Sequence, residues 1–248
     1  MTILETRNLT KDFAGFRAVD RVNLAFEEGK VHALVGPNGA GKTTLFNLLT
    51  GFLKPSAGQI LIFGHDVTHL RPDEIARQGV ARSFQITSLF DQLTVGEHVI
   101  LALQSATNLG YRFWSSDRVL DRFRPRAMEL LAQVGLKDLA PHPVASLPYG
   151  NKRALELSLA LALEPKLLLL DEPTAGMGLE DVKRTIDLIR RIRAGRTVVL
   201  VEHNMGVVSE LADNVVVLQY GRVIAQGSYE TMRANPQVIA AYLGEEHA

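Results

Sequence analysis

Cysteine is absent from this sequence of 248 residues, and so is any excess of charge of one sign. Without cysteine there can be no disulfide framework and no thiolate metal site, which is typical of a protein from a reducing cytosol. The 27 Lys and Arg residues balance the 27 Asp and Glu residues, so no net field attracts nucleic acid. The composition therefore argues against a disulfide-stabilised secreted protein and against a nucleic-acid partner.

Long hydrophobic runs are also missing. The longest candidate, Leu157–Leu170, is interrupted by Glu164 and Lys166, whereas a membrane helix needs about 18 or more apolar residues in a row. The opening MTILETRNLT lacks the charged-then-apolar layout of a signal peptide. Because 46% of the residues are nevertheless apolar, we expect a folded protein with a large core. Without a long apolar run, we expect it not to span a membrane and, if it serves one, to dock on its surface.

The remaining pattern alternates strands and helices and predicts an α/β fold. Strands are expected at Ile3–Thr6, Val22–Phe26, Val31–Val35, Gln59–Phe63, Leu167–Leu170 and Thr197–Val201. Helices are expected at Thr44–Leu49, Arg153–Leu163 and Glu180–Arg193, and a hairpin at Val215–Leu218 and Arg222–Ala225.

Residues from about Thr94 to Leu139 have a different, helical spacing of leucine and alanine and predict a helical insertion. Its expected core is Val99, Leu103, Leu120, Met128, Leu131 and Val134, with a loop at Asn108–Ser116. We therefore divide the chain into a core of residues 1–90 and 157–227, a helical subdomain of residues 91–156, and a helical tail of residues 228–248.

The strand Val31–Val35 runs directly into Gly36-Pro-Asn-Gly-Ala-Gly-Lys-Thr-Thr44, which fits the phosphate-binding pattern GxxxxGK[ST]. Its backbone N–H groups and the N-terminus of the next helix can surround phosphate oxygens. Lys42 can reach the β- and γ-phosphates of ATP, and the Thr43 hydroxyl can ligate Mg²⁺. Gly36, Pro37, Asn38, Gly39, Ala40, Gly41, Lys42, Thr43 and Thr44 are the predicted ATP-binding residues.

Asp171 and Glu172 follow the buried strand Leu167–Leu170, at the edge where α/β sheets place ligands. Asp171 is placed to hold Mg²⁺, directly or through water, and Glu172 to polarise an attacking water. An acidic pair that only ends a strand and begins the turn at Pro173 is the alternative interpretation.

Taken in order, these features resemble the nucleotide-binding domain of ABC transporters over nearly the whole chain. The resemblance implies a P-loop NTPase (RecA-like) core with an antiparallel β subdomain and an inserted α-helical subdomain. It also implies that Phe13 stacks on adenine, that Gln85 touches Mg²⁺ or the attacking water, and that His203 contacts the γ-phosphate. A core position for Phe13 and a structural role for His203 are the competing interpretations.

The sequence departs from the family at two motifs. Where the family has LSGGQ, this chain has Leu147-Pro-Tyr-Gly-Asn151; Leu147, Tyr149, Gly150 and Asn151 are the residues expected to face the ATP of an opposite subunit. Pro148 offers neither hydroxyl nor N–H, and Ala175-Gly-Met-Gly178 replaces the family's SALD. Two interpretations are possible: a degenerate site that binds ATP but hydrolyses it poorly, or a subfamily in which these altered motifs function normally. We favour the second interpretation and hypothesise that Pro148 weakens the ATP-bound dimer.

Four further sequence segments are similar to the LivG-type ATPases of branched-chain amino acid importers. These are Gly79–Gln85, Leu147–Gly150, Glu202-His-Asn-Met205 and the tail Asn235–Gly244. Importers of this type also transport related amino acids, amides and urea. The resemblance implies a second ATPase subunit (identical or LivF-type), membrane permeases, indirectly a periplasmic binding protein, and a peripheral place on the cytoplasmic side of a bacterial inner membrane. Ile86–Leu93 is the candidate contact with a permease, although subdomain core explains it equally well.

Three alternative functions remain at this stage. A non-transport ABC ATPase of DNA repair or translation usually has tandem domains, zinc modules or basic arms, which this chain lacks. A regulatory ATP-binding module with weak hydrolysis is suggested only by the two altered motifs. The ATPase of a lipid or lipopolysaccharide exporter has a similar length and architecture.

Overall fold

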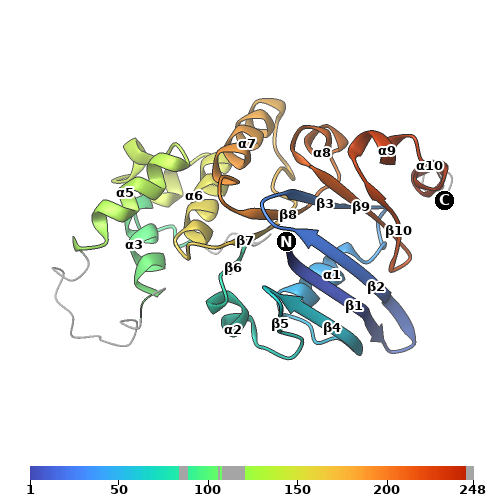
Figure 1. The fold of residues 1–248 in the computed structure, drawn as a ribbon. Coiled ribbons are helices and arrows are strands. Elements are labelled where there is room, and N and C mark those ends of the chain that lie inside the picture. Colours follow the sequence, from blue (N-terminus) through green and yellow to red (C-terminus); the bar gives the residue numbers. More distant parts are fainter. Residues whose placement is uncertain (84–88, 106, 108–120, 244–248) are drawn as a thin grey trace.

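The structure is a computed structural model that describes residues 1–83, 89–105, 107 and 121–243 (Figure 1). Its centre is a six-stranded sheet in the order β10-β9-β3-β8-β7-β6. These strands are β3 (Val31–Val35), β6 (Val80–Ser83), β7 (Leu167–Asp171), β8 (Thr197–Val201), β9 (Asn214–Gln219) and β10 (Arg222–Gly227). All neighbours pair in parallel except β9 and β10, which form the predicted antiparallel hairpin.

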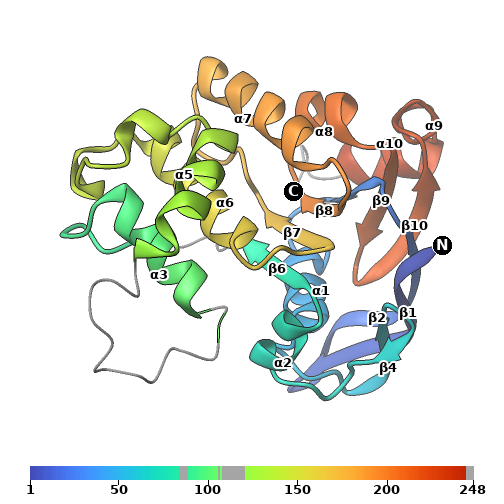
Figure 2. The same ribbon diagram turned by 60° about the vertical axis from the view of Figure 1, so that its left-hand side comes forward.

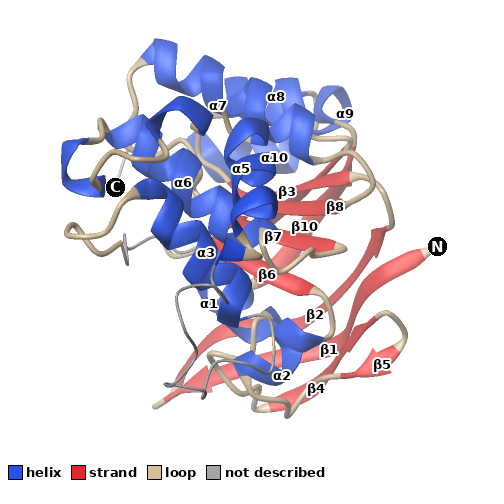
Figure 3. Ribbon diagram, turned by 90° about the vertical axis from the view of Figure 1, so that its left-hand side faces the viewer, coloured by secondary structure: helices blue, strands red, loops and turns tan. Residues whose placement is uncertain are grey.

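A second sheet is antiparallel and has the order β2-β1-β4-β5. It consists of β1 (Thr2–Phe13), β2 (Phe16–Glu27), β4 (Ala57–Ile62) and β5 (His65–Asp66). The helix α1 (Lys42–Leu49) lies between the two sheets (Figure 3) and buries Leu45, Phe46, Leu48 and Leu49 there.

Helices cover the other face of the central sheet and form a separate group at one end of the molecule (Figure 2). The covering helices are α7 (Leu179–Ile192), α8 (Met205–Leu211), α9 (Tyr229–Arg233) and α10 (Pro236–Leu243). The end group contains α3 (Val95–Ser105), α5 (Arg124–Gln133) and α6 (Tyr149–Leu161), with the 3-10 turns η1 (Lys137–Leu139) and η2 (Val144–Ser146). The short α2 (Pro72–Arg77) precedes β6. Among the described residues, no helix combines the length and apolarity needed to cross a bilayer.

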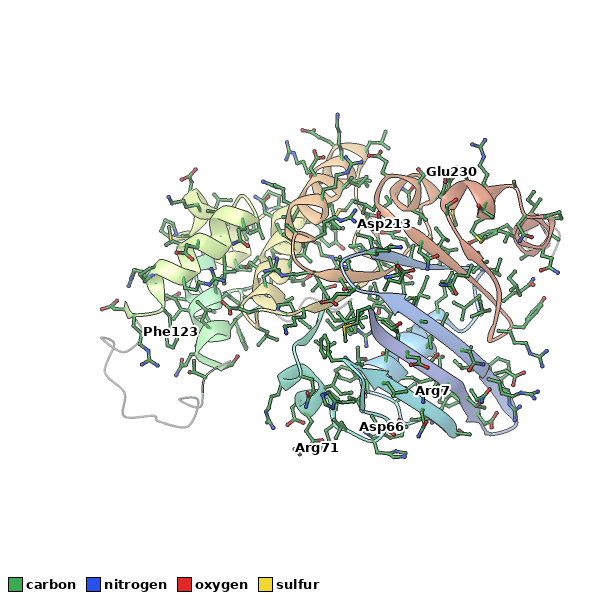
Figure 4. All side chains as sticks on the ribbon, viewed as in Figure 1. Arg7, Asp66, Arg71, Phe123, Asp213 and Glu230 are labelled. Carbon is green, nitrogen blue, oxygen red and sulfur yellow. The ribbon has the colours of Figure 1, made fainter. Side chains whose placement is uncertain are left out.

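Alternation along the central strands produces two cores. On β7, Leu168 and Leu170 pack with the covering helices, whereas Leu167 and Leu169 pack with α1 and the antiparallel sheet. All five residues of β7 are buried, as are all five of β8, which explains why both read as continuous apolar runs. Side chains fill the space between these layers, while the labelled Arg7 and Asp66 lie on the antiparallel sheet and Phe123 in the end group (Figure 4).

The α/β prediction is confirmed, with differences at particular elements. The strands β3 and β8 have the predicted bounds, but β1 and β2 are each 12 residues long and form one hairpin. The helix α1 begins at Lys42 rather than Thr44. Of the predicted helical core, Val99, Leu103, Leu131 and Val134 are buried, but Met128 is only half-buried because it packs on the edge of the core. Leu120 and the loop Asn108–Ser116 lie outside the described residues.

Candidate functional site

The predicted phosphate loop connects β3 to α1 and is enclosed by backbone from two other strands. A Cβ atom on Gly36 would lie 2.1 Å from the carbonyl oxygen of Leu218, and one on Gly41 would lie 2.4 Å from that of Ala18. Both glycines have positive φ, 146° and 99°, a region that other residues enter only with strain. Glycine is therefore required because β2 and the β9–β10 hairpin approach the loop at backbone distance.

Lys42 is buried against the loop it belongs to. Its Nζ donates to the carbonyl oxygens of Gly36 at 2.6 Å and Pro37 at 2.8 Å, and the residue is only 5% exposed. The ammonium is thus held on the concave side of the loop, where phosphate oxygens can replace or share its contacts. Thr43 is exposed in the first turn of α1, and the remaining predicted ATP-binding positions all lie in this strand–loop–helix unit.

Asp171 ends β7 and forms a buried ion pair that the sequence did not indicate. Its Oδ2 accepts from Nη2 of Arg82 at 2.7 Å, with side-chain exposures of 2% for Asp171 and 11% for Arg82. The other terminal nitrogen of the Arg82 guanidinium, Nη1, donates to Asn47 Oδ1 at 2.6 Å and Thr50 Oγ1 at 3.2 Å, both on or next to α1. Arg82 therefore joins the edge strand β6, the acid on β7 and the helix that follows the phosphate loop.

Glu172 and His203 meet across the ends of neighbouring strands β7 and β8. The distance from His203 Nε2 to Glu172 Oε1 is 2.9 Å. Glu172 has a positive φ of 46°, and its N–H donates to Val201 O at 3.0 Å. A non-glycine residue in the left-handed region is uncommon, and functional sites are one of the places where such residues occur. An imidazole at this distance can orient a carboxylate that accepts a proton from water.

The side chains present suit Mg²⁺ only together with a bound nucleotide. Thr43 and Asp171 offer a hydroxyl and a carboxylate, the hard oxygen ligands that this ion prefers. Among the described residues, no group of three or more His, Cys, Asp and Glu side chains could hold a metal ion by itself. The other predicted ligand, Gln85, lies outside the described residues.

Phe13 lies at the end of β1, next to an open recess. It is 41% exposed, and Lys11 Nζ lies 5.0 Å from the centroid of its ring. The recess is lined by Asp12, Gly15, Arg17, Asp20, Gln219, Tyr220, Arg222 and Ile224. Arg222 is the main cause of the lowered pKa of the Asp20 carboxyl group, and this ion pair joins β2 to β10. The structure thus leaves Phe13 available for stacking rather than in the core.

The predicted signature loop lies at the start of α6, in the end group of helices (Figure 1). Pro148 is the N-cap residue, with no side-chain hydrogen bond to the helix. The Tyr149 hydroxyl donates to the carbonyl oxygen of Ala175 at 3.3 Å, which connects the loop to the turn after Glu172. Leu147 is 7% exposed, whereas Gly150 and Asn151 lie in the first turn of α6.

A glycine-rich loop between a parallel strand and a helix, with an acid at the end of a second parallel strand, defines a P-loop nucleoside triphosphatase. The sequence pattern of the ABC transporter family matches residues 19–175. The chain belongs to the ABC transporter family, as an ATP-binding subunit with the ABC-type ATPase fold. A second pattern, that of the branched-chain amino acid ATP-binding cassette transporters, matches residues 222–248.

Two curated relatives are similar over almost the full length. The high-affinity branched-chain amino acid transport ATP-binding protein BraF of Pseudomonas aeruginosa is 39% identical, with 98% of each chain covered. The corresponding protein LivG of Escherichia coli K12 is 38% identical, again with 98% of each chain covered.

Solved structures agree with the fold. The ADP conformation of an ATP-binding cassette of an ABC transporter has a TM-score of 0.87 at 29% identity, covering 98% of this chain and 99% of that one. A dimeric ATP-binding cassette bound to ADP and phosphate has a TM-score of 0.76 at 27% identity, covering 92% and 99%. The first of these cassettes is described in an ADP conformation and the second as a dimer, and both share the fold of this chain.

Proposed function

We propose that this chain hydrolyses ATP to power an importer of branched-chain amino acids, or of related amino acids, amides or urea. The names of its relatives and the match of residues 222–248 to the branched-chain pattern support this substrate class. The observation that carries the ATPase mechanism is the 2.9 Å contact of Glu172 with His203 beside the phosphate loop. The division into an ATP-binding core, a helical subdomain and a tail belongs to the same proposal, with α6 shared between the first two.

The residues have distinct roles in this mechanism. The phosphate-loop N–H groups and Lys42 hold the β- and γ-phosphates. Mg²⁺ would be held by Thr43, Asp171 and Gln85 together with phosphate oxygens, and it supplies positive charge to the γ-phosphate. Glu172 accepts a proton from the water that attacks the γ-phosphorus, and the bond to the β-phosphate oxygen breaks to give ADP and phosphate. His203 orients Glu172 and contacts the γ-phosphate, and Phe13 stacks on adenine.

A second ATPase subunit completes the site. The signature loop, with Leu147, Tyr149, Gly150 and Asn151, contacts the ATP bound to that subunit, which is either identical or LivF-type. Gly150 supplies a backbone donor at a helix N-terminus, where an anion is favoured. The pair works with integral-membrane permeases on the cytoplasmic side of the membrane, has a periplasmic binding protein as an indirect partner only, and has no nucleic-acid partner.

Size-exclusion chromatography of Glu172→Gln with Mg²⁺, with and without ATP, tests the motor. We expect ATP to convert the variant into a dimer, either alone or after addition of the LivF-type subunit, because bound ATP cannot be cleaved. The exposed Glu27→Gln is the matched control and should hydrolyse ATP like the wild type. The proposal would be contradicted by a wild-type chain that binds ATP but neither forms a dimer nor hydrolyses ATP, both alone and with the LivF-type subunit.

Transport is tested in membrane vesicles from a bacterium whose own LivG-type ATPase gene is deleted but whose permeases remain. Wild-type chain should restore ATP-dependent uptake of labelled leucine, and Glu172→Gln should not. Absence of uptake in the presence of normal ATP hydrolysis would reject the branched-chain substrate class while leaving the ATPase intact. ATP-dependent release of labelled lipid from the membrane, in place of leucine uptake, would favour the alternative function as the ATPase of a lipid or lipopolysaccharide exporter.

A further inference from the structure

Glu202 is a buried carboxylate that connects the two turns of the candidate active site. It follows β8 and directly precedes His203, and it is 3% exposed. Its Oε1 accepts from the N–H of Thr174 at 3.1 Å and from the Thr174 hydroxyl at 2.6 Å. Its Oε2 accepts from the N–H groups of His203 at 3.1 Å and Asn204 at 3.3 Å.

These four donors come from two different segments. Thr174 belongs to the turn that follows β7 and lies two residues after Glu172, while His203 and Asn204 open the turn before α8. One oxygen of the Glu202 carboxylate therefore holds the turn after β7, and the other oxygen holds the turn before α8. None of the four donors carries a formal charge, so uncharged N–H and O–H groups hold both oxygens of Glu202.

We infer that Glu202 is a positioning residue, which fixes the distance between the Glu172 carboxylate and the His203 imidazole by holding both of their turns. Its side chain does not touch the reacting atoms and acts through the 2.9 Å contact of the other two residues. The inference rests on the proposed ATPase mechanism but not on the transported substrate.

A carboxylate is needed at this position because all four contacts are to donors. An amide of the same shape accepts on one oxygen only, and its NH₂ group would face two donors on the other side. One of the two turns must then move away. Because a shift of about 1 Å in a catalytic group can lower the rate about 10²-fold, the effect should appear in kcat rather than in ATP affinity.

The decisive measurement is steady-state ATP hydrolysis by the full chain, with its partner subunits where these are required, in Glu202→Gln, His203→Ala and the double variant. We expect Glu202→Gln to lower kcat by about 10- to 100-fold with KM within about twofold. In the His203→Ala background the same change should cause little further loss, because the contact that Glu202 organises is already gone. Glu210→Gln, an exposed acid on α8, is the matched control and should leave kcat unchanged.

A purely structural role predicts a different pattern. An unchanged kcat in Glu202→Gln, a loss expressed only in KM, or an equal loss in both backgrounds would overturn the inference. Thr174→Val and Thr174→Ser keep the test decisive if Glu202→Gln does not fold. Valine removes one donor to Oε1 and should lower kcat, whereas serine retains the hydroxyl and should restore it; equal rates in these two variants would reject the role. Wild-type hydrolysis without leucine transport would reject the substrate proposal and leave this inference standing.

Discussion

The buried pair of Arg82 and Asp171 gives a sharp prediction about stability. We consider Arg82→Met, which retains an unbranched apolar side chain but removes the guanidinium group and its charge. In the wild type, Asp171 is 2% exposed and accepts from Arg82 at 2.7 Å. The variant leaves that carboxylate buried without its cation.

The expected magnitude follows from the burial of the pair. Removing one member of a buried ion pair costs about 3–5 kcal/mol, because the other charge remains uncompensated. The control is Arg184→Met, since Arg184 approaches Glu180 at 2.6 Å but the two side chains are 70% and 81% exposed. An exposed pair contributes at most about 1 kcal/mol. Loss of the shorter contact, Arg184–Glu180, should therefore lower the free energy of unfolding less than loss of the longer contact, Arg82–Asp171.

Urea unfolding with ADP, with and without Mg²⁺, measures both effects. Arg82→Met should lose about 3–5 kcal/mol in free energy of unfolding. If Asp171 holds Mg²⁺ as proposed, the variant should also recover more stability than the wild type when Mg²⁺ is added, because the ion would replace the missing cation. Equal losses in Arg82→Met and Arg184→Met, or an identical response to Mg²⁺, would refute the reasoning.

Three further predictions concern the signature loop, a buried histidine and the phosphate loop. Pro148→Ser places a capping hydroxyl at the start of α6, so it should raise the free energy of unfolding by about 1 kcal/mol. In a Glu172→Gln background it should also strengthen ATP-driven dimerisation. An unchanged dimer dissociation constant would reject the hypothesis that Pro148 weakens the dimer. Burial lowers the pKa of His32 below the usual histidine value of 6.5, so the unfolded chain takes up the proton first and stability should fall as the pH drops below about 6.5. In His32→Gln the slope of unfolding free energy between about pH 7 and 5 should be smaller, and an equal slope would contradict this. Gly36→Ala would place a Cβ 2.1 Å from Leu218 O, so calorimetry should detect no ATP binding, and retained affinity would show that the loop can be displaced.

The sequence predicts the parts of the site that depend on neighbouring residues. The strand β3, the glycine loop and α1 are continuous in the chain, and the buried leucines of β7 lead directly to Asp171. Such local patterns carry both the element and the chemistry. The same holds for the hairpin of β9 and β10, which a glycine turn marks.

The contacts made by Arg82 and Glu202 could not be predicted in this way. Arg82 meets Asp171 across 89 residues of sequence, and Glu202 meets Thr174 across 28. Whether an Arg is on the surface or pairs with a buried acid depends on strand order, and the short strand β6 has no periodic pattern of its own. A charged residue inside an otherwise apolar stretch next to a catalytic motif is the one signal that could have directed attention to either.

The position of β8 has a consequence for the synthesis of the protein. It lies between β3 and β7 and pairs with both, although it follows them in the chain. A nascent polypeptide that ends before Thr197 already contains the phosphate loop after β3 and Glu172 after β7, but it lacks the strand that joins β3 and β7 in one sheet. Until β8 emerges from the ribosome, two hydrophobic strand edges are open to pairing with other chains. The strand that joins the two halves of the candidate site therefore also covers the two strand edges through which newly made chains could pair with one another.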